Sequence, residues 1–226
     1  MATETDYIKL RSHPLFANLT EQKISEVESV MRLKTVYRGE VIKFGYGEFS
    51  KIYLLVSGKI KIAQFGNDHG ELIKDIITAP DVFGNLSMEM NPSLDVYAQA
   101  LAANVLIAIF NISDFQYLLQ SNQAMLTTFS KMVMGKLGRL EQRHTELAFC
   151  DTKSRLIQFI KNWAQTDGNK IGDRIILNNY LTHADIANSI AASRQTVSTL
   201  LNELRDAGML LYNRKQIELS QSLLWN

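Results

Sequence analysis

Apolar residues near the carboxyl end recur with the spacing of two short helices. Between Leu181 and Asp206 the sequence reads LTHADIANSIAASRQTVSTLLNELRD. We expect the first helix to begin after Thr182, because its hydroxyl and the Asp185 carboxylate match the pattern of a capping box. Ser193 offers a second N-cap, and apolar residues follow each cap at steps of three and four. The pattern predicts a helix, a tight turn and a second helix.

The polar positions of the second predicted helix indicate a binding surface. They begin in its first turn, carry no acidic group and can all form hydrogen bonds with base edges or phosphates. These positions are Arg194, Gln195, Ser198, Thr199 and Asn202. The small side chain of Ala187 on the first helix lets the two helices pack closely. We expect a helix-turn-helix that inserts into the major groove of DNA, and the alternative is a helical hairpin whose polar face is only solvated.

The middle of the chain shows a different pattern, in which apolar and polar residues nearly alternate over short runs. Between Thr35 and Ile112 we expect strands at VIKF, KIYLLV, KIKIAQF, LIKDII, VYAQALA and VLIAIF. Gly, Asn, Asp and Pro separate these runs, as at Ala79-Pro80-Asp81, and are typical of turns. Strands of this length and spacing predict a compact β-roll or jelly roll.

Two helical stretches flank the predicted strands. The first covers residues 5–33, with Thr20 as an N-cap and apolar residues at helical intervals up to Val30 or Met31. The second runs as one long helix from Ser113 to about Phe149. We expect the first stretch to cover one end of the roll.

The long helix carries an apolar stripe in alternating steps of three and four, which is typical of a coiled-coil seam. The seam positions are Leu126, Val133, Leu137, Leu140, His144 and Leu147. Met125 and Phe129 lie on a neighbouring face and are expected to pack onto the roll. We predict that two identical chains pair along this seam, and the alternative is a single buried helix inside a monomer.

These elements divide the chain into three expected parts within an α+β fold. A helical cap and a β-roll sensor domain occupy residues 1–112, a dimerisation helix residues 113–150, and a winged helix-turn-helix residues 151–226. Asp151 marks the last boundary, because with Ser154 it can cap a new helix, expected from Arg155 to Ala164.

A β-wing is expected after the two short helices. The sequence LLYNRKQIEL follows Gly208 and reads as two strands around a turn. Arg214 and Lys215 fall at the tip of this turn, where they could contact phosphates. Exposed basic residues in a turn also serve solubility alone, so both readings stay open.

The stretch SRQTVSTLLNELRDAGML, residues 193–210, closely resembles the helix-turn-helix signature of the Crp/Fnr family of bacterial transcription regulators. The stretch YRGEVIKFGYGEFSKIYLLVSGKIKI resembles the start of a cyclic-nucleotide-binding-type sensor domain. The resemblance implies a homodimer that binds a palindromic site on double-stranded DNA, with its two recognition helices about 34 Å apart. It also implies RNA polymerase as a partner. Ala191 stands where many members have Gly, so it must adopt the backbone angle of the turn at a cost in strain.

The expected DNA contacts combine this resemblance with the polar positions described above. Base readout is expected from Arg194, Gln195, Ser198 and Thr199. Phosphate contacts are expected from Thr182, Ser193, Arg214 and Lys215.

The resemblance also implies where a cyclic nucleotide would bind, and the sequence departs from the family there. The matching stretch is VFGNLSMEMNPSLDVYAQA. Gly84 and Leu86 match the family, but Asn85 replaces the Glu that holds the ribose. Asp95 and Val96 replace the Arg and the Ser or Thr of the phosphate site, so the charge is reversed where a phosphate would lie.

No other arginine can take over this role, since none occurs between Arg38 and Arg139. A lysine offers only a point charge without the bidentate fork of arginine, and most candidates alternate with apolar residues and are expected to face solvent. These candidates are Lys43, Lys51, Lys59, Lys61 and Lys74. Leu140-Glu141 replaces the adenine-contacting Thr-Ser pair of the family. We therefore expect no cyclic AMP, and another small-molecule effector or none at a pocket formed by Gly84, Asn85, Leu86, Asp95, Val96 and Leu140.

Composition sets broad limits on the remaining functions. The net charge is only +1, so a basic DNA-binding footprint must be local. The single cysteine, Cys150, excludes a disulfide framework. No membrane span or signal peptide is evident, which predicts a cytoplasmic protein. The four histidines lack metal-ligand spacing and no catalytic motif occurs, so we expect neither a metal site nor an enzyme.

Two alternatives remain open. The first is a cupin-like metal enzyme fused to a DNA-binding module, because β-rolls also host metal catalysis. The second is an interaction module whose helix-turn-helix binds a protein partner. Phosphate contacts give DNA binding a steep salt dependence, which would separate the second alternative from a DNA-binding regulator.

Overall fold

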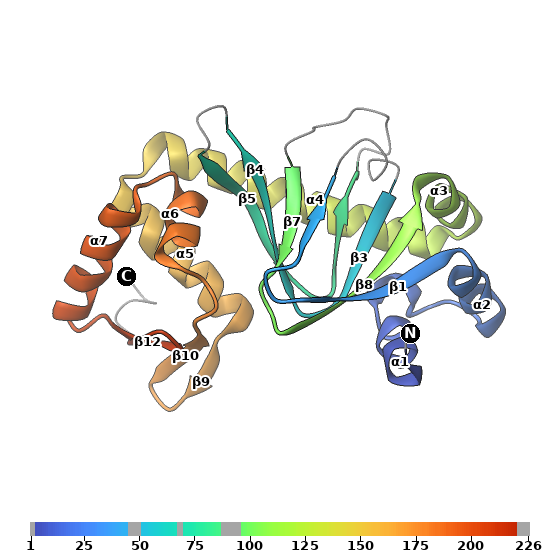
Figure 1. Ribbon diagram of the computed structural model, residues 1–226, viewed down its shortest axis with the longest axis horizontal. Coiled ribbons are helices and arrows are strands. Elements are labelled where there is room, and N and C mark those ends of the chain that lie inside the picture. Colours follow the sequence, from blue (N-terminus) through green and yellow to red (C-terminus); the bar gives the residue numbers. More distant parts are fainter. Residues whose placement is uncertain (1–2, 45–50, 67–69, 87–95, 221–226) are drawn as a thin grey trace. The chain divides into compact units, whose positions relative to one another are not determined.

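The computed structural model describes residues 3–44, 51–66, 70–86 and 96–220 (Figure 1). The chain divides into two compact units, Met1–Leu140 and Glu141–Asn226. The first unit holds the roll and its helices, and the second holds the helix-turn-helix. Within the described part of the chain, no helix has both the length and the apolar character needed to cross a bilayer.

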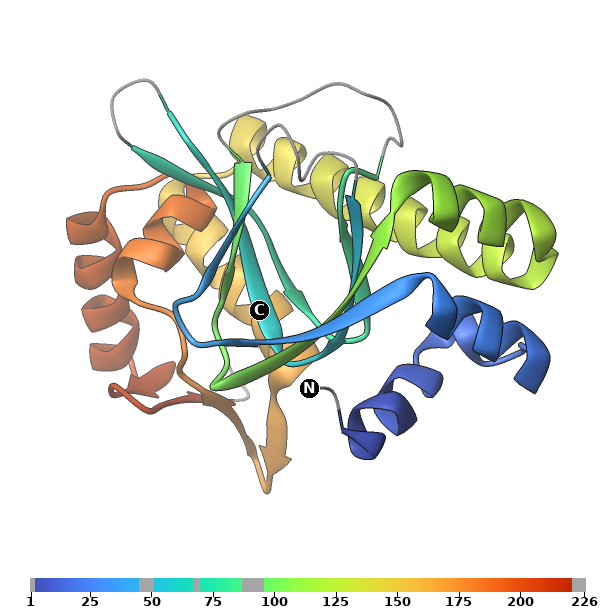
Figure 2. The same ribbon diagram turned by 45° about the vertical axis from the view of Figure 1, so that its right-hand side comes forward.

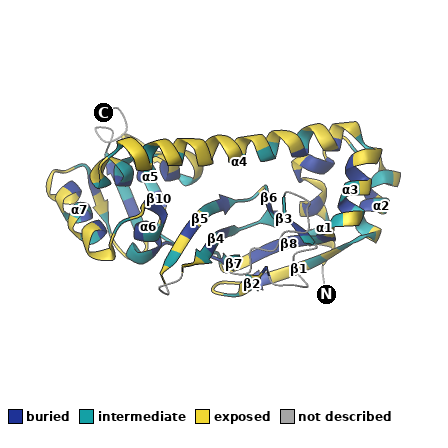
Figure 3. Cartoon of the chain, turned by 90° about the horizontal axis from the view of Figure 1, so that it is seen from above, coloured by how far each residue is buried: buried dark blue, intermediate teal, exposed yellow. Residues whose placement is uncertain are grey.

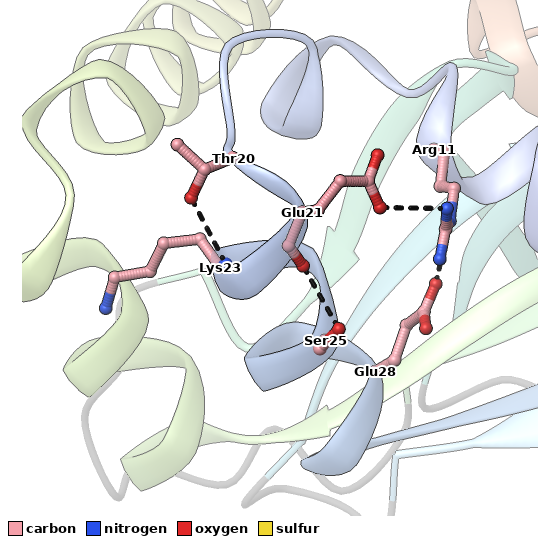
Figure 4. Close-up of polar contacts among 6 residues, drawn as sticks. All are labelled: Arg11, Thr20, Glu21, Lys23, Ser25 and Glu28. Carbon is pink, nitrogen blue, oxygen red and sulfur yellow. Dashed lines mark hydrogen bonds and ion pairs between the residues drawn. The ribbon is translucent and has the colours of Figure 1, made fainter.

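The N-terminal segment forms three short helices, namely α1 (Glu4–Arg11), the 3-10 helix η1 (Pro14–Phe16) and α2 (Glu21–Ser29). The Thr20 hydroxyl accepts the backbone N–H of Lys23, which confirms the predicted N-cap. Arg11 joins α1 to α2, since its guanidinium lies 3.3 Å from the Glu21 carboxylate and 3.0 Å from that of Glu28 (Figure 4). The expected extension of the helix to Met31 was wrong, because α2 ends at Ser29 and Met31 begins the first strand.

Two antiparallel four-stranded sheets form the roll (Figure 2). The first has the strand order β1-β8-β3-β6, with β1 (Met31–Tyr37), β8 (Asn104–Asn111), β3 (Lys51–Ser57) and β6 (Asp81–Gly84). The second has the order β2-β7-β4-β5, with β2 (Val41–Lys43), β7 (Val96–Ala100), β4 (Lys59–Phe65) and β5 (Glu71–Thr78). Apolar side chains from both sheets fill the space between them, and Tyr53 stacks on Phe83 with ring centroids 4.9 Å apart.

All six strands predicted for the roll are present, and the roll has two further strands that were not predicted, β1 and β6. Strand β1 begins at Met31, within the stretch expected to be helical. Strand β6 begins at Asp81, which was read as part of a turn. Tyr53 in β3 pairs with Phe83 in β6. The hydrogen-bond partners of this short strand therefore lie about thirty residues earlier in the chain.

Helices cover the outer face of the first sheet. Phe115 of α3 (Ile112–Ser121) contacts Phe129 of α4 (Gln123–Phe149) with ring centroids 5.4 Å apart. Met125 and Phe129 are buried in this layer, as predicted. The expectation of one unbroken helix from Ser113 was wrong. Asn122 adopts an extended conformation between α3 and α4, and its side-chain oxygen accepts the Met125 N–H at 2.9 Å, so it caps a new helix.

The second unit packs three helices on a small sheet. After the end of α4, it contains α5 (Thr152–Asp167), β9 (Asn169–Ile171), β10 (Arg174–Asn178), α6 (His183–Ile190), α7 (Arg194–Asp206), β11 (Leu210–Tyr212) and β12 (Gln216–Ser220). The sheet order is β11-β12-β10-β9. The Asp151 carboxylate accepts the Ser154 N–H at 2.7 Å, which confirms the predicted cap, although α5 is longer than expected at both ends. Leu156, Ile186, Val197 and Leu201 are buried in this unit.

Candidate DNA interface

Two side-chain caps and one strained turn residue define the helix-turn-helix. The Thr182 hydroxyl accepts the Asp185 N–H at 3.0 Å, and the Asp185 carboxylate accepts the Thr182 N–H at 2.9 Å, which completes the capping box of α6. The Ser193 hydroxyl accepts the Thr196 N–H at 3.0 Å at the start of α7. Ala191 lies between the helices with φ 52° and ψ 57°. It is the only non-glycine residue with positive φ in the described part of the chain, a conformation that costs an alanine roughly 1–2 kcal/mol.

The first turn of α7 presents an exposed polar edge. Ser193, Arg194, Gln195 and Thr199 are exposed, whereas Val197 on the opposite side is fully buried. Thr196 is also exposed, and its hydroxyl lies 2.8 Å from that of Ser193. Thr196 was not among the predicted residues, because it lies between the polar face and the apolar stripe and belongs to neither pattern.

Two of the predicted polar residues are turned toward the protein. Ser198 is half-buried, and its hydroxyl lies 2.8 Å from Nδ1 of His183 and 3.0 Å from the Arg194 carbonyl oxygen. Asn202 is half-buried and accepts the Tyr212 hydroxyl at 3.0 Å. The five polar positions therefore form an outer edge at Arg194, Gln195 and Thr199 and an inner row at Ser198 and Asn202.

An acidic residue follows the polar edge farther along α7. Glu203 is exposed and directly follows Asn202, the last of the five polar positions, which themselves carry no acidic group. Its carboxylate lies 3.4 Å from the ammonium group of Lys153 on α5. Both side chains are about half exposed, and such a pair screens the negative charge without contributing much stability.

His183 connects α6, α7 and the wing. Its ring lies 5.7 Å from that of Tyr212 on β11, in addition to its contact with Ser198. Partial burial, and secondly the positive charge of Arg194, lower the pKa of His183. The imidazole therefore favours the neutral form. In that form Nδ1 forms a hydrogen bond with the Ser198 hydroxyl, as donor or acceptor according to the tautomer.

The residues predicted to contact phosphates differ in exposure and in the hydrogen bonds that they already form. The Thr182 hydroxyl donates a hydrogen bond to the Asp185 carboxylate at 2.7 Å, so a phosphate would compete with this bond. Arg214 and Lys215 are exposed at the wing tip. Asn213 fixes the backbone there, since its side-chain oxygen accepts the Lys215 N–H at 2.8 Å.

Comparisons with known proteins identify this unit. Residues 154–221 match the Crp-like helix-turn-helix domain. The chain is 26% identical over 189 residues to the global nitrogen regulator of Synechococcus elongatus, covering 83% of this chain and 85% of that one. It is 27% identical over 190 residues to the CRP-like cAMP-activated global transcriptional regulator of Mycobacterium tuberculosis, covering 82% of each. This chain is a homologue of the Crp/Fnr-type transcription regulators.

Solved structures show the same fold. A mutant of CooA from Carboxydothermus hydrogenoformans matches with a TM-score of 0.76 and 23% identity, covering 99% of this chain and 94% of that one. FixK2 from Bradyrhizobium japonicum matches with a TM-score of 0.72 and 19% identity, covering 86% of this chain and 96% of that one. The Crp/Fnr-type architecture of β-roll, long helix and helix-turn-helix is therefore confirmed.

The predicted seam of this Crp/Fnr homologue lies on the exposed side of α4, which Figure 3 shows as largely exposed. The exposed fractions are 36% for Leu126, 46% for Leu137, 61% for Leu140 and 43% for Leu147. His144 is exposed, and Val133 is half-buried against the helical layer. Met134 is 65% exposed and adds an apolar side chain that the stripe did not include.

The predicted effector residues are dispersed among different surroundings. Gly84 ends β6 with φ 97°, and a Cβ atom there would lie 2.7 Å from the Tyr53 ring. Leu86 packs against the helical layer, whereas Val96 packs between the sheets and Leu140 is exposed on α4. The Asn85 N–H donates to the Lys51 carbonyl at 3.3 Å. Asp95 lies outside the described residues.

Lys61 is the lysine that differs most from expectation. It is buried, and its ammonium group lies 3.0 Å from the Glu71 carboxylate, which also accepts the Tyr97 hydroxyl. Ile60 and Ile62 on either side of it in β4 pack between the sheets. Because neighbouring side chains in a strand point to opposite faces, Lys61 lies on the outer face of its sheet, away from the roll interior.

An ion-pair cluster joins α4 to the roll. The Lys136 ammonium group lies 2.9 Å from the Asp81 carboxylate and 3.6 Å from that of Asp75. The Arg139 guanidinium lies 3.5 Å from Asp81 and 3.6 Å from Asp75. Lys136 and Asp81 are nearly buried, at 14% and 13% side-chain exposure. Among the residues that the structure describes, no three His, Cys, Asp or Glu side chains gather as a metal site would require.

Proposed function

We propose that this Crp/Fnr homologue is a homodimeric regulator that reads a palindromic DNA site through Arg194 and Gln195. The observation that carries the proposal is the exposure of both side chains in the first turn of α7, directly after the Ser193 cap. Arginine can pair with guanine through two hydrogen bonds, and glutamine can pair with adenine in the same way. The first turn of a recognition helix is the part that reaches the base edges.

Further contacts would surround this pair. Thr199 and Ser198 are the other proposed base-reading residues, and the hydrogen bonds of Ser198 to His183 and Arg194 make it the more constrained of the two. Thr182, Ser193, Arg214 and Lys215 are proposed to contact phosphates. Phosphate contacts orient the protein on the duplex, whereas base contacts select the sequence.

The homodimer would form along α4. Its apolar seam is exposed in the single chain, and burying such a stripe against a second copy gives the favourable free energy that a coiled coil needs. A parallel pair of helices would bring two copies of α7 to the same side, about 34 Å apart, as a palindrome requires. RNA polymerase is the proposed further partner, and the cytoplasm is the proposed location.

We propose that the roll does not use cyclic AMP in the usual way. Asn85 and Asp95 stand where the ribose and phosphate contacts of the family are expected, and Lys61 lies on the outer face of its sheet. A different small effector, or no effector at all, fits this residue set better. We propose no enzymatic step and no metal.

Selection of bound duplexes from a random pool, with and without cyclic AMP, tests the proposal. We expect enrichment of a palindrome with half-sites one helical turn apart, and the same enrichment in both arms. Absence of any enriched sequence would overturn sequence-specific binding. Enrichment only in the presence of cyclic AMP would overturn our interpretation of Asn85 and Asp95.

A further inference from the structure

Two arginines from outside the helix-turn-helix bind the backbone where α6 ends. Arg143, near the end of α4, donates from Nη2 to the Ser189 carbonyl at 2.6 Å. Arg155, in the first turn of α5, donates from Nε to the Ile190 carbonyl at 2.9 Å and from Nη2 to the Ala191 carbonyl at 3.4 Å. Three consecutive carbonyl oxygens therefore receive donors from the α4–α5 junction.

Arg155 also binds the junction itself. Its Nη1 donates to the Cys150 carbonyl at 2.7 Å, directly after α4, and its Nη2 lies 3.3 Å from the Thr152 hydroxyl. One planar guanidinium thus spans the end of α4, the start of α5 and the turn after α6. A lysine could not replace it, because an ammonium group on a flexible stem lacks the fixed fork that reaches several acceptors at once.

The end of α6 has particular need of these donors. The last carbonyls of a helix have no partner within the helix and carry partial negative charge, so cations are favourable there. Helix α6 spans only eight residues, and the chain then passes through Ala191 in the left-handed conformation. The Ala192 N–H closes the turn on the Ala187 carbonyl at 3.0 Å. The Ala191 N–H donates to the same carbonyl, so without the arginines the carbonyls of Ser189, Ile190 and Ala191 would lose the charged donors that oppose relaxation of Ala191.

We propose that Arg143 and Arg155 are positioning residues that hold the turn of the helix-turn-helix and thereby set the orientation of α7. This proposal rests on the proposed function for its effect on DNA affinity, but not for its effect on the turn. Neither arginine belongs to the exposed polar edge. Their contribution to DNA binding is expected to act through the backbone of residues 189–191.

The test compares Arg155→Met, Arg155→Lys and Arg143→Met with the wild-type full chain. Hydrogen exchange of the Ala192 amide reports the turn directly, and titration with the selected duplex at several salt concentrations reports binding. We expect Arg155→Met to accelerate exchange and weaken binding about tenfold or more, since charge-assisted hydrogen bonds are among the stronger ones. Arg155→Lys should recover only part of this loss. Arg143→Met should also accelerate exchange, because it removes the donor to the Ser189 carbonyl.

Arg174→Met is the matched control, since it removes an exposed arginine of the same unit whose partner is Glu218. It should leave Ala192 exchange unchanged. Ala191→Gly provides a rescue, because glycine adopts the left-handed conformation without strain. We expect it to restore part of the protection and affinity lost in Arg155→Met.

Each contrary result identifies its own cause. Unchanged Ala192 exchange in Arg155→Met would overturn the positioning role, whatever happens to DNA binding. The slope of log binding constant against log salt concentration is the second criterion. If its magnitude falls by about one in Arg155→Met, the positioning role is also overturned, because that result means that Arg155 contacts a phosphate directly. If the wild type binds no duplex, the proposed function fails, while the exchange measurement still decides the role of the two arginines. Far-UV circular dichroism of each variant excludes unfolding as the source of fast exchange.

Discussion

Nδ1 of His183 lies 2.8 Å from the Ser198 hydroxyl oxygen, which joins the first residue of α6 to the second turn of α7. The two residues are fifteen positions apart in the chain. Because the Ser198 hydroxyl also donates to the Arg194 carbonyl, this contact extends to the backbone of the residue that is proposed to read guanine. His183 therefore helps to fix the position of Arg194 on the polar edge, through Ser198.

Replacing His183 with Phe should remove the bond to Ser198 while retaining an aromatic ring beside Tyr212. We expect a loss of about 0.5–1.5 kcal/mol in binding to the selected duplex, the usual net value of one hydrogen bond. Fluorescence anisotropy of a labelled duplex measures it. Ser198→Ala should give a similar loss, and the double variant should lose little more than either single one. Fully additive losses would show that the two side chains act independently.

Arg194→Ala should reduce affinity for the selected duplex by about 1–3 kcal/mol and relax the base preference at one position of each half-site. Lys215→Ala is the informative comparison. A phosphate contact at the wing tip predicts uniform weakening across sequences and a decrease of about one in the salt slope. Titration against matched and mismatched duplexes distinguishes the two effects. Equal binding of wild type to both duplexes would contradict base readout by Arg194.

The elements that could be predicted from the sequence are those whose signals are local. The caps at Thr20, Asp151, Thr182 and Ser193 each use a side chain and a backbone N–H only three residues away. The six predicted strands likewise follow from short alternating runs. In these cases a few neighbouring residues contain the whole physical reason for the structure.

The features that escaped prediction depend on partners far along the chain. The donors to Ser189 and Ile190 come from Arg143 and Arg155, 46 and 35 positions away. Ser198 and Asn202 looked equivalent to their neighbours until their partners on other elements were known. The break at Asn122 was also missed, because apolar residues fit helical spacing both before it, at Phe115, and after it, at Met125.

The exposed seam of α4 leads to a prediction about assembly. Leu140→Asp should convert a dimer into a folded monomer, because the carboxylate would be desolvated against the partner helix while it is solvated in the single chain. We expect the dissociation constant of the dimer to increase by at least about a hundredfold, which corresponds to roughly 3 kcal/mol. Sedimentation equilibrium measures this constant. Lys131→Asp changes an exposed residue outside the stripe and should leave the dimer intact. A wild-type chain that is monomeric at all concentrations would rule out the seam.

His13 predicts an acid-dependent stability of the first unit. It is 2% exposed, and burial lowers the pKa of its imidazole from 6.5 to about 4. Between these two values the unfolded chain binds a proton that the folded chain does not. The free energy of unfolding should therefore be highest above pH 6.5 and fall as the pH decreases, by about 3 kcal/mol in total by pH 4.

His13→Asn tests this assignment, because asparagine has no proton to gain in this range and can still accept the Leu15 N–H that Nδ1 now accepts. The fall in stability between pH 6.5 and 4 should become shallower in the variant. Hydrogen exchange of the roll strands, followed by mass spectrometry at several pH values, measures it for this unit alone. An identical slope in both proteins would assign the acid sensitivity to other groups.

The ion-pair cluster between α4 and the roll predicts unequal contributions from its two cations. Lys136 is nearly buried beside Asp81, whereas Arg139 is 55% exposed. Lys136→Met would remove the closest cation from the nearly buried Asp81 carboxylate and leave it the Val82 N–H and the longer contact to Arg139, so we expect a loss of about 2 kcal/mol in unfolding free energy. Arg139→Met should cost less than about 1 kcal/mol, because solvent already screens its charge. Asp81→Asn in the Lys136→Met background should recover part of the loss by removing the uncompensated charge. Urea unfolding followed by hydrogen exchange of α4 measures all three, and equal losses for the two cations would show that burial does not determine the strength of this contact.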